Sequence, residues 1–322
     1  MTLVRLGYVA MSVHLQNASP SKTMTYATFS KMEDQEAAIH KLERIAQTNL
    51  HNCLRLLKHN VAHDISFFRF SSKLVPLATH PDLHEWNYMS SIQEPLEEIG
   101  DFLMHHPEQR IDFHPDHFVL LNSPKKEVLQ QAIHTLRMHY RLLKGMGIDP
   151  KHRCVLHVGG GYGDKEKALE SFIHNWAYVP TDLQQMIMLE NDDKIFTPAD
   201  TLYLCEKLAI PMVFDYHHYL ANHDDNENWK DEWTRMVNTW KQSTLPVKVH
   251  ISSPRSEEKF RAHADYVDSS MLMDFLRSVK GSVAQIDCMI EAKQKDDALF
   301  TLMKDLQEYP EVTIMDGARF YV

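Results

Sequence analysis

Short apolar runs alternate with longer amphipathic stretches along most of this chain. Eight of the runs are rich in β-branched and aromatic residues, which favour strands, and the stretches between them are helical in pattern. The runs are LVRLGYVA (3–10), ISFFRFS (65–71), RIDFHP (110–115), CVLHVG (154–159), MIMLEN (186–191), MVFDYHH (212–218), VKVHIS (247–252) and CMIEAK (288–293). Strands that alternate with helices predict a parallel sheet, and eight such units suit a closed (β/α)₈ barrel, an α/β fold.

Helix-terminus signals support this division of the chain. Residues 34–61 form a long amphipathic stretch that Asp34 would open, and residues 124–147 begin with proline and end with glycine, as helices prefer. Thr197-Pro198 is typical of an N-cap and first turn, here for a helix ending near Leu208. No linker interrupts the pattern, so we expect one domain over residues 1–322. The strand-like tail 311–322 lies beyond the eighth unit, and the pattern does not place it.

Composition agrees with a globular enzyme of this class. A length of 322 residues is usual for an α/β barrel, and 43% hydrophobic residues can build a large core. The four cysteines are far apart and form no CxxC pair, which argues against a zinc ribbon and a disulfide scaffold. They fit a reducing cytoplasm, where we expect the protein to reside. No apolar run is long enough for a membrane helix, and Arg5 with its alternating neighbours favours a first strand over a secretory signal.

Two features of the composition concern charge. The chain has 21 histidines and a formal net charge of −10. An acidic protein is a poor partner for nucleic acid, because binding to phosphates depends on Lys and Arg. That objection weakens if the acidic residues are metal ligands, since several divalent ions would make the local field positive.

Potential metal ligands occur where six consecutive strands end. They are His114, His157, Glu190, Asp215 followed by His218, His250 and Glu291. One buried histidine or carboxylate at a strand end is usually structural, but in a barrel the C-terminal strand ends converge on one face, where catalytic residues lie. Converging carboxylates would repel one another unless cations lay between them. The pattern therefore predicts a metal cluster at the C-terminal mouth.

The mixture of ligands narrows the chemistry. Imidazole together with carboxylate favours manganese or zinc, and seven or more candidate ligands exceed what one ion needs, so we expect two or three ions. Such a site can hold the attacking and leaving oxygens of a phosphoryl displacement and lower the pKa of bound water. Hydrolysis by metal-activated water is the predicted reaction.

Other motifs do not compete with this interpretation. GGGYGDK (159–165) lacks the ending of a phosphate-binding loop, no GxSxG is present, and the first strand lacks the HxH of amidohydrolases. A sugar isomerase or epimerase on the same barrel remains the main alternative, because it also uses Glu, Asp and His around metals. A non-catalytic metal-binding or DNA-scaffolding protein is a third possibility.

Nine segments in order along the chain resemble the UV damage endonucleases, relatives of endonuclease IV in the xylose-isomerase-like group of barrels. The segments are RLGY (5–8), LVPLATHP (74–81), FHPDHF (113–118), VLHVGGGYGDK (155–165), LEND (189–192), VFDYHH (213–218), VKVHIS (247–252), AHADY (262–266) and IEAK (290–293). The resemblance implies a monomeric DNA repair enzyme that binds damaged duplex and nicks it 5′ to cyclobutane pyrimidine dimers, 6-4 photoproducts and also abasic sites.

The resemblance also implies a centre of three manganese ions, with Zn²⁺ or Mg²⁺ as alternatives. The first ion would be held by His114, His157 and Glu190; the second by Glu190, Asp215, His250 and Glu291; the third by His218 and His263. His80 matches a further family histidine near the metals, although as a loop residue it could simply cap a turn. Lys248 matches a lysine carried in carboxylated form. From its burial alone, Lys248 must either pair with an acid or be modified. Glu190, Glu291, Lys248 and His250 are the expected catalytic residues.

Lesion recognition in the family uses a pair that is commonly Gln-Tyr and here is His117-Phe118. Phe118 can stack on bases, whereas His117 replaces an amide with a titratable ring, which leaves lesion preference open. Tyr8 matches a family tyrosine lining the site. We expect phosphate contacts from four basic residues just past strands seven and eight. They are Arg255, Arg261, Lys293 and Lys295.

Overall fold

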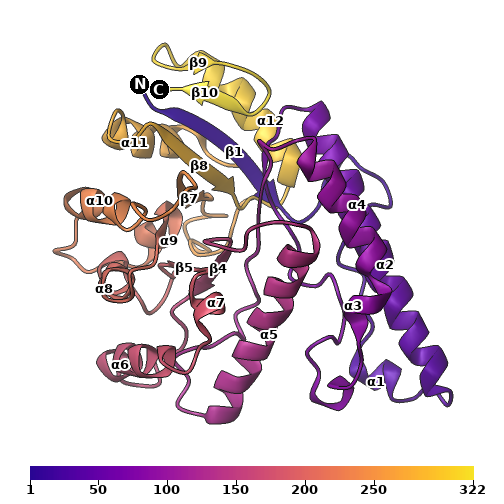
Figure 1. Cartoon of the computed structure of the whole chain (residues 1–322). Coiled ribbons are helices and arrows are strands. Elements are labelled where there is room, and N and C mark those ends of the chain that lie inside the picture. Colours follow the sequence, from indigo (N-terminus) through magenta and orange to yellow (C-terminus); the bar gives the residue numbers. More distant parts are fainter.

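The computed structural model describes residues 1–322 and contains eight parallel strands that alternate with helices around a barrel (Figure 1). The strands are β1 (Leu3–Val9), β2 (Phe67–Arg69), β3 (Arg110–Asp112), β4 (Cys154–His157), β5 (Ile187–Glu190), β6 (Met212–Asp215), β7 (Val247–Ile251) and β8 (Gln285–Ile290). Each lies within or overlaps one of the eight apolar runs. The expectation of an α/β barrel is confirmed.

The strand order shows how the barrel closes. The sheet runs β3-β2-β1-β8-β7-β6-β5-β4, so β1 and β8 lie in the middle of the path. A parallel bridge between Phe113 and Cys154 joins the two ends of the path. Register within the sheet pairs His157 with Glu190 and Asp215 with His250, which brings side chains from neighbouring strands to the same level.

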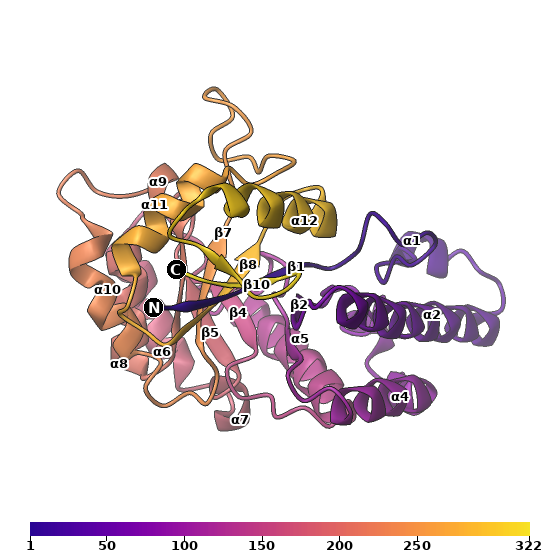
Figure 2. The ribbon, with the colours of Figure 1, turned by 90° about the horizontal axis from the view of Figure 1, so that it is seen from above.

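Twelve α-helices and two short 3₁₀ helices connect the strands. They are α1 (Tyr26–Phe29), α2 (Gln35–Ala62), η1 (Pro81–Leu83), α3 (Tyr88–Ser91), α4 (Gln93–Met104), α5 (Lys126–Gly145), α6 (Lys165–Trp176), α7 (Thr181–Gln184), α8 (Pro198–Leu208), α9 (Tyr216–Ala221), α10 (Trp229–Asn238), α11 (Ser269–Val279), α12 (Lys295–Asp305) and η2 (Leu306–Glu308). Seen from above, α1, α2 and α4 extend to one side of the barrel (Figure 2).

The predicted helix caps are found with one change. The Asp34 side chain accepts a hydrogen bond from the Ala37 amide at the start of α2. Thr197 caps α8 within a reciprocal capping box. Helix α5 begins at Lys126, after Pro124 rather than at it, and a left-handed glycine, Gly147 (φ +69°), follows the helix end as a C-terminal signal should.

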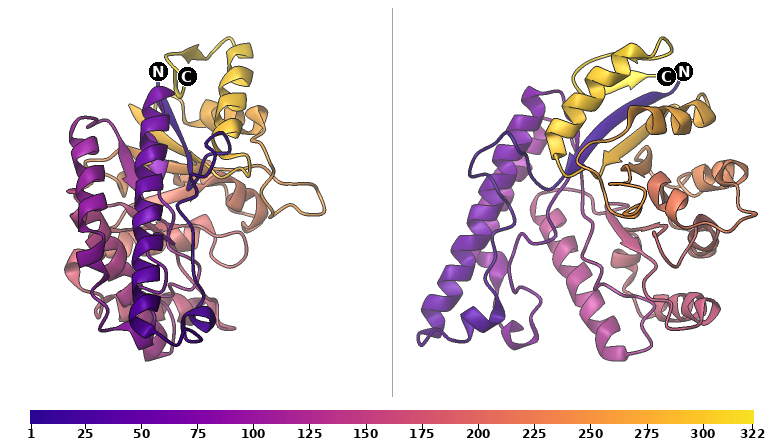
Figure 3. Two further views of the ribbon diagram at one scale, coloured as in Figure 1. Left: turned by 90° about the vertical axis from the view of Figure 1, so that its right-hand side faces the viewer. Right: turned by 180° about the vertical axis from the view of Figure 1, so that it is seen from behind.

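The C-terminal tail forms a small antiparallel hairpin, β9 (Thr313–Ile314) and β10 (Arg319–Tyr321). Strand β10 pairs with the first half of β1, whose second half pairs with β2. The two chain termini consequently lie next to each other, as both views of Figure 3 show. Because β10 meets the N-terminal half of β1, the tail lies at the end of the barrel opposite the mouth.

Charged side chains are buried inside the barrel near the same closed end. Arg5 donates to both carboxylate oxygens of Asp287, and Arg110 bridges Asp287 (2.8 Å) and Asp112 (3.0 Å). Strand β8 begins at Gln285, three residues before its predicted start at Cys288. The prediction looked for apolar residues, and it missed this segment because its buried residue Asp287 is an acid that pairs with arginines. Among the helices, none combines the length and apolar character needed to cross a membrane.

Candidate metal centre

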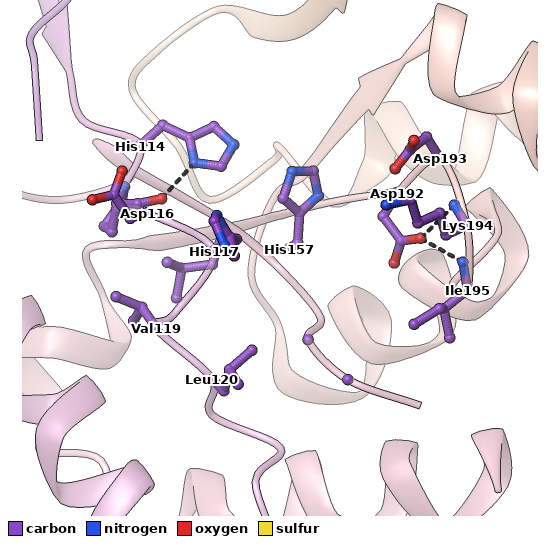
Figure 4. A pocket seen from close by; sticks show the side chains of 14 residues that line it. His114, Asp116, His117, Val119, Leu120, His157, Asp192, Asp193, Lys194 and Ile195 are labelled. Carbon is purple, nitrogen blue, oxygen red and sulfur yellow. Dashed lines mark hydrogen bonds between the residues drawn. The ribbon is translucent and has the colours of Figure 1, made fainter. Parts of the chain in front are cut away.

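Three side chains from adjacent strand ends form the first candidate ligand group. The ligand atoms of His114, His157 and Glu190 all lie within 4.8 Å of one another. Nε2 of His114 is 2.9 Å from Oε2 of Glu190, and Nε2 of His157 is 3.9 Å from the same oxygen. Figure 4 shows the two histidines beside a pocket of about 360 Å³, bounded on its far side by the Asp192–Ile195 loop.

A second group shares Glu190 with the first. Ligand atoms of Glu190, Asp215 and His250 also lie within 4.8 Å of one another, and all three residues are buried. Here the other carboxylate oxygen faces the group, because Oε1 of Glu190 is 2.9 Å from Nδ1 of His250. The two oxygens of Glu190 therefore face two different sets of ligands, as expected of a carboxylate that bridges two cations.

Glu291, His218 and His263 extend the cluster across the mouth. Oε1 of Glu291 is 3.2 Å from Nδ1 of His250, and Oε2 is 3.8 Å from Nδ1 of His263. The rings of His218 and His263 are 6.1 Å apart. Nδ1 of His218 is 2.9 Å from the Asn191 carbonyl, so it carries the proton and leaves Nε2 as the ligand atom.

The protonation states suit cation binding. Burial raises the pKa of the Glu190 carboxyl, but His250 and His157 outweigh it and hold that pKa well below its ordinary value. Burial likewise opposes ionisation of Glu291, and Arg69 and His250 lower its pKa well below normal. Burial lowers the pKa of His114 to about 4, so its imidazole is neutral at pH 7. Anionic carboxylates and a neutral imidazole are the forms that bind metal ions.

His218 behaves differently. Burial favours its neutral form, yet the carboxylates of Asp215, Glu190 and Glu291 raise its pKa to about 9. The excess negative charge inside the mouth is therefore large enough to hold a second proton on this buried ring, and a cation bound at Nε2 would displace that proton.

Unpartnered buried atoms test whether the residues fit a metal. Oδ2 of Asp215 and Nε2 of His250 are buried and make no hydrogen bond. An unsatisfied buried carboxylate oxygen is costly unless a cation takes it. With imidazole nitrogens around it, this donor set fits a divalent transition metal.

Lys248 satisfies one of the two sequence alternatives. Its ammonium group is fully buried and donates to Oδ2 of Asp112 at 3.2 Å, so the lysine pairs with an acid. Burial lowers its pKa to about 8, and Arg110 and Arg69 act in the same direction while Asp112 opposes them. Lys248 lies two residues before His250 on β7 and therefore occupies the level below the ligands.

Two predicted site residues make their contacts outside the cluster. The centroid of the His80 ring lies 3.8 Å from that of Tyr26, and the two rings are stacked. Nδ1 of His80 accepts a hydrogen bond from the Asp82 N–H at the start of η1. His80 therefore caps a turn, which is the alternative role that the sequence offered. It makes no hydrogen bond or ion pair with the cluster. Tyr8 is fully buried and donates to Oδ1 of Asn60 at 2.6 Å, which leaves no surface of this side chain for a nucleic acid.

The expected DNA-contacting residues are mostly at the surface. Phe118 is 72% exposed and its ring lies 4.1 Å from that of His117, which lines the pocket beside His114. Of the four basic residues expected to contact phosphates, three are exposed: Arg255, Arg261 and Lys293. Lys295, the fourth, is half-buried. Burial and the nearby Arg69 lower its pKa, and Glu291 opposes them only in part.

Sequence reasoning missed two cations near the centre. Arg69, the last residue of β2, donates a hydrogen bond to Glu291. Lys194 lines the pocket. It lies on a loop whose backbone N–H groups donate hydrogen bonds to the Asp192 carboxylate. Arg69 could have been found by the rule that identified the ligands, since it too ends a strand; it was passed over because it is not a metal-ligating type.

Comparison with known proteins agrees with this geometry. The profile of a family described as UV-endonuclease UvdE matches residues 4–320. The UV DNA damage endonuclease of Halalkalibacterium halodurans is 56% identical over 313 residues, which cover 97% of each chain. The protein of the same name from Bacillus pumilus is 43% identical over 302 residues, covering 94% of this chain and 93% of that protein.

Solved structures give the same result. A crystal structure of SacUVDE superposes with a TM-score of 0.81 at 31% identity, covering 95% of this chain and 98% of that one. Endonuclease IV from Thermus thermophilus shares the fold alone, with a TM-score of 0.53 and 13% identity over 95% of this chain and all of that one.

The family match extends from the first strand to the tail hairpin, and it confirms the resemblance found in the sequence. It decides against the sugar isomerase alternative, because this is a family of nucleases, hydrolases of phosphodiester bonds. With the strand-end ligands, the barrel and the matched residues in agreement, the chain belongs to the UV-endonuclease UvdE family.

Proposed function

We propose that this protein nicks the backbone of duplex DNA on the 5′ side of cyclobutane pyrimidine dimers and 6-4 photoproducts, and that it also cuts at abasic sites. The observation that carries the proposal is Glu190, whose two oxygens face two ligand groups at the barrel mouth. The relatives named UV DNA damage endonuclease supply the substrate class.

The centre would hold two or three divalent ions, with Mn²⁺ as the proposed metal and Zn²⁺ or Mg²⁺ as alternatives. When bound, such ions lower the pKa of water and stabilise charge on the leaving oxygen. The residues that would hold them are His114, His157, Glu190, Asp215, His250, Glu291, His218 and His263. His80 is proposed near these ions through Nε2, because the capping of η1 uses only its Nδ1.

The chain itself supplies orientation and charge. Glu190, Asp215 and Glu291 provide the negative charge that keeps cations at the mouth. Backbone carbonyls fix two imidazoles: His114 Nδ1 lies 3.1 Å from the Pro115 carbonyl, and His218 is oriented by Asn191. These contacts hold the Nε2 atoms of both rings toward the centre of the mouth.

Damaged duplex would lie across the mouth as the substrate of a monomer. Phe118, exposed at the rim, would fill the space left by the extruded lesion, with His117 beside it. Extrusion costs less where dimerisation has already weakened pairing and stacking. Arg255, Arg261, Lys293 and Lys295 would contact phosphates.

Carboxylation of Lys248 is also proposed; it would replace the pairing of the ammonium group with Asp112, and Arg110 and Arg69 are the cations near the resulting carbamate. Addition of carbon dioxide to the amine forms an N–C bond and releases a proton, so it requires the neutral amine. A lysine whose pKa is about 8 supplies that form near neutral pH far more readily than an exposed one. Intact-mass measurement under gentle, near-neutral conditions should find an excess of one carbon dioxide that Lys248→Arg removes. Equal masses for wild type and variant, after correction for the substitution, would refute this part.

One assay tests the function. Purified protein with Mn²⁺ is incubated with irradiated and unirradiated supercoiled plasmid, and nicked circles are counted over time. We expect rapid nicking of irradiated plasmid alone, and sequencing of the ends should place the nick 5′ to pyrimidine dimers. Equal rates on both plasmids, or none on either, would contradict the proposal.

A further inference from the structure

Arg69 is fixed at the barrel mouth through both its backbone and its guanidinium group. Its backbone is fixed in the sheet, because Arg69 pairs with Val9 and Asp112 and its carbonyl accepts the Ala10 amide at 2.8 Å. At the other end, Nη1 donates to Oε1 of Glu291. The side chain is thus placed between the end of β2 and the end of β8.

Most of the donors of this guanidinium remain available. Arginine carries five N–H groups in a rigid fork. Of the side-chain nitrogens, only Nη1 makes a hydrogen bond, to Glu291. Nε and Nη2 have no partner in the protein, and they are not buried. Since 15% of the side chain is exposed, these remaining donors are accessible at the rim.

The Arg69–Glu291 pair has a second cation near it at the rim. Lys295 lies close enough to Arg69 and Glu291 for both to affect its pKa, and its backbone is held in the left-handed region (φ +53°). Two cations therefore lie near the Glu291 carboxylate at the rim. A planar guanidinium with free parallel donors matches the oxygens of a phosphate.

We propose that Arg69 binds a non-bridging oxygen of the target phosphate, with Glu291 holding the guanidinium in the orientation that this contact requires. The inference rests on the proposed function, since it takes the DNA backbone as the ligand. It differs from a purely local role, in which Arg69 would only neutralise Glu291.

The test measures binding of the metal-loaded protein to a short duplex that carries one abasic-site analogue and a non-cleavable 3′-methylene phosphonate at the nick position, at several salt concentrations. A phosphate contact adds about 1 to the slope of log affinity against log salt. We expect Arg69→Gln to weaken binding and reduce that slope by about 1, whereas Arg69→Lys, which keeps the charge, retains the slope.

Arg235→Gln is the matched control. Arg235 also pairs with a carboxylate, Glu206, but on the outer helices α10 and α8, so its removal should leave the slope unchanged. A duplex with a neutral methylphosphonate at the nick position locates the contact. It should bind wild type more weakly than the charged methylene phosphonate duplex does, with a smaller loss for Arg69→Gln.

An unchanged salt slope together with altered Mn²⁺ affinity would overturn the inference and leave Arg69 as a counter-ion of Glu291. Should Arg69→Gln fail to fold because Glu291 is left unpaired, the comparison is made between Glu291→Gln and the double variant, in which no unpaired carboxylate remains. Nicking by wild type is measured in parallel. A wild type that nicks irradiated plasmid with an unaffected Arg69→Gln slope refutes only this inference, whereas a wild type that does not nick refutes the proposed function.

Discussion

At the scale of single residues, Glu190 is the one on which both candidate cation positions depend. Gln has the same shape, but its amide nitrogen cannot be a ligand and its charge is zero. Replacing a group that merely orients a ligand already costs about 10- to 100-fold, so Glu190→Gln should lower nicking of irradiated plasmid by at least about 100-fold. Elemental analysis should find less bound manganese per chain.

Glu206→Gln is the control for this variant, because Glu206 is a carboxylate paired with arginine on an outer helix. It should retain metal content and nicking. Full metal content in Glu190→Gln would show that the two ligand groups do not share this carboxylate.

Two adjacent histidines allow a second test at this scale. Both ring nitrogens of His217 are used, by the Ser252 hydroxyl (2.6 Å) and the Phe260 carbonyl (2.7 Å), whereas His218 uses only Nδ1. We expect His218→Ala to lose the ion of the third position while keeping those at Glu190, as elemental analysis would measure.

His217→Ala should have the converse effect. It leaves buried polar partners unsatisfied and should lower the free energy of unfolding by about 1–3 kcal/mol, with metal content unchanged. If both variants lost metal equally, the distinction drawn from their hydrogen bonds would be wrong.

Which site residues could be predicted from sequence depended on how each is positioned. Sequence could predict that the strand-end side chains lie together, because strand ends of a barrel must converge; these are His114, His157, Glu190, Asp215, His250 and Glu291. The contacts of His80 with Tyr26 and of Tyr8 with Asn60 could not be predicted, since no local pattern records them. Arg69 also ends a strand, but its hydrogen bond to Glu291 became visible only in the structure.

At the scale of elements, helix α5 packs on the barrel through a buried histidine. The His139 ring lies 4.8 Å from that of Phe113 on the strand-three run, its Nδ1 contacts the Thr135 carbonyl, and its Nε2 is buried without a partner. Burial lowers its pKa from 6.5 to about 4. Below pH 6.5, His139 therefore binds a proton in the unfolded chain but stays neutral in the native state until the pH approaches 4.

The sign follows from this difference in protonation. As pH falls from 6.5 toward 4, the unfolded state binds a proton that the native state does not, so stability falls. His139→Leu keeps apolar contact with Phe113 and removes the titration. Urea unfolding should show that the variant loses about 2 kcal/mol less than wild type between about pH 6.5 and pH 5.

His134→Leu provides the control, because His134 is on the exposed face of the same helix and is hydrated in both states. Its acid profile should match that of wild type. An identical profile for His139→Leu would mean that the packing of α5 is not what makes the protein acid-sensitive.

Element boundaries were less predictable than element types. The eight apolar runs predicted the strands, but β8 begins at Gln285 because Asp287 is buried by pairing with Arg5 and Arg110. The one-turn helices escaped sequence analysis because so few residues show no period of 3.6. Their positions follow from the loops that they close, which are set by the folded barrel.

At the scale of the whole molecule, the two ends of the barrel carry different properties. The ligands lie at the C-terminal ends of the strands, whereas the tail hairpin, both termini and the pairing of Arg5 with Asp287 lie toward the other end. In barrels of this type the first face serves catalysis and the second serves stability. The tail, which sequence could not place, thus belongs to the stabilising end, where it covers the first half of β1.

The tail gives the last prediction. Phe320 is fully buried in β10 against the start of β1, so truncation to alanine removes a large apolar contact and leaves a cavity. Phe320→Ala should lower the free energy of unfolding by about 3–5 kcal/mol. Met315, 47% exposed on the same hairpin, is the control, and Met315→Ala should change stability by less than about 0.5 kcal/mol. Both folded variants should retain wild-type manganese content, because the mouth lies at the opposite end. Loss of metal from folded Phe320→Ala would show that the tail supports the site as well as the fold.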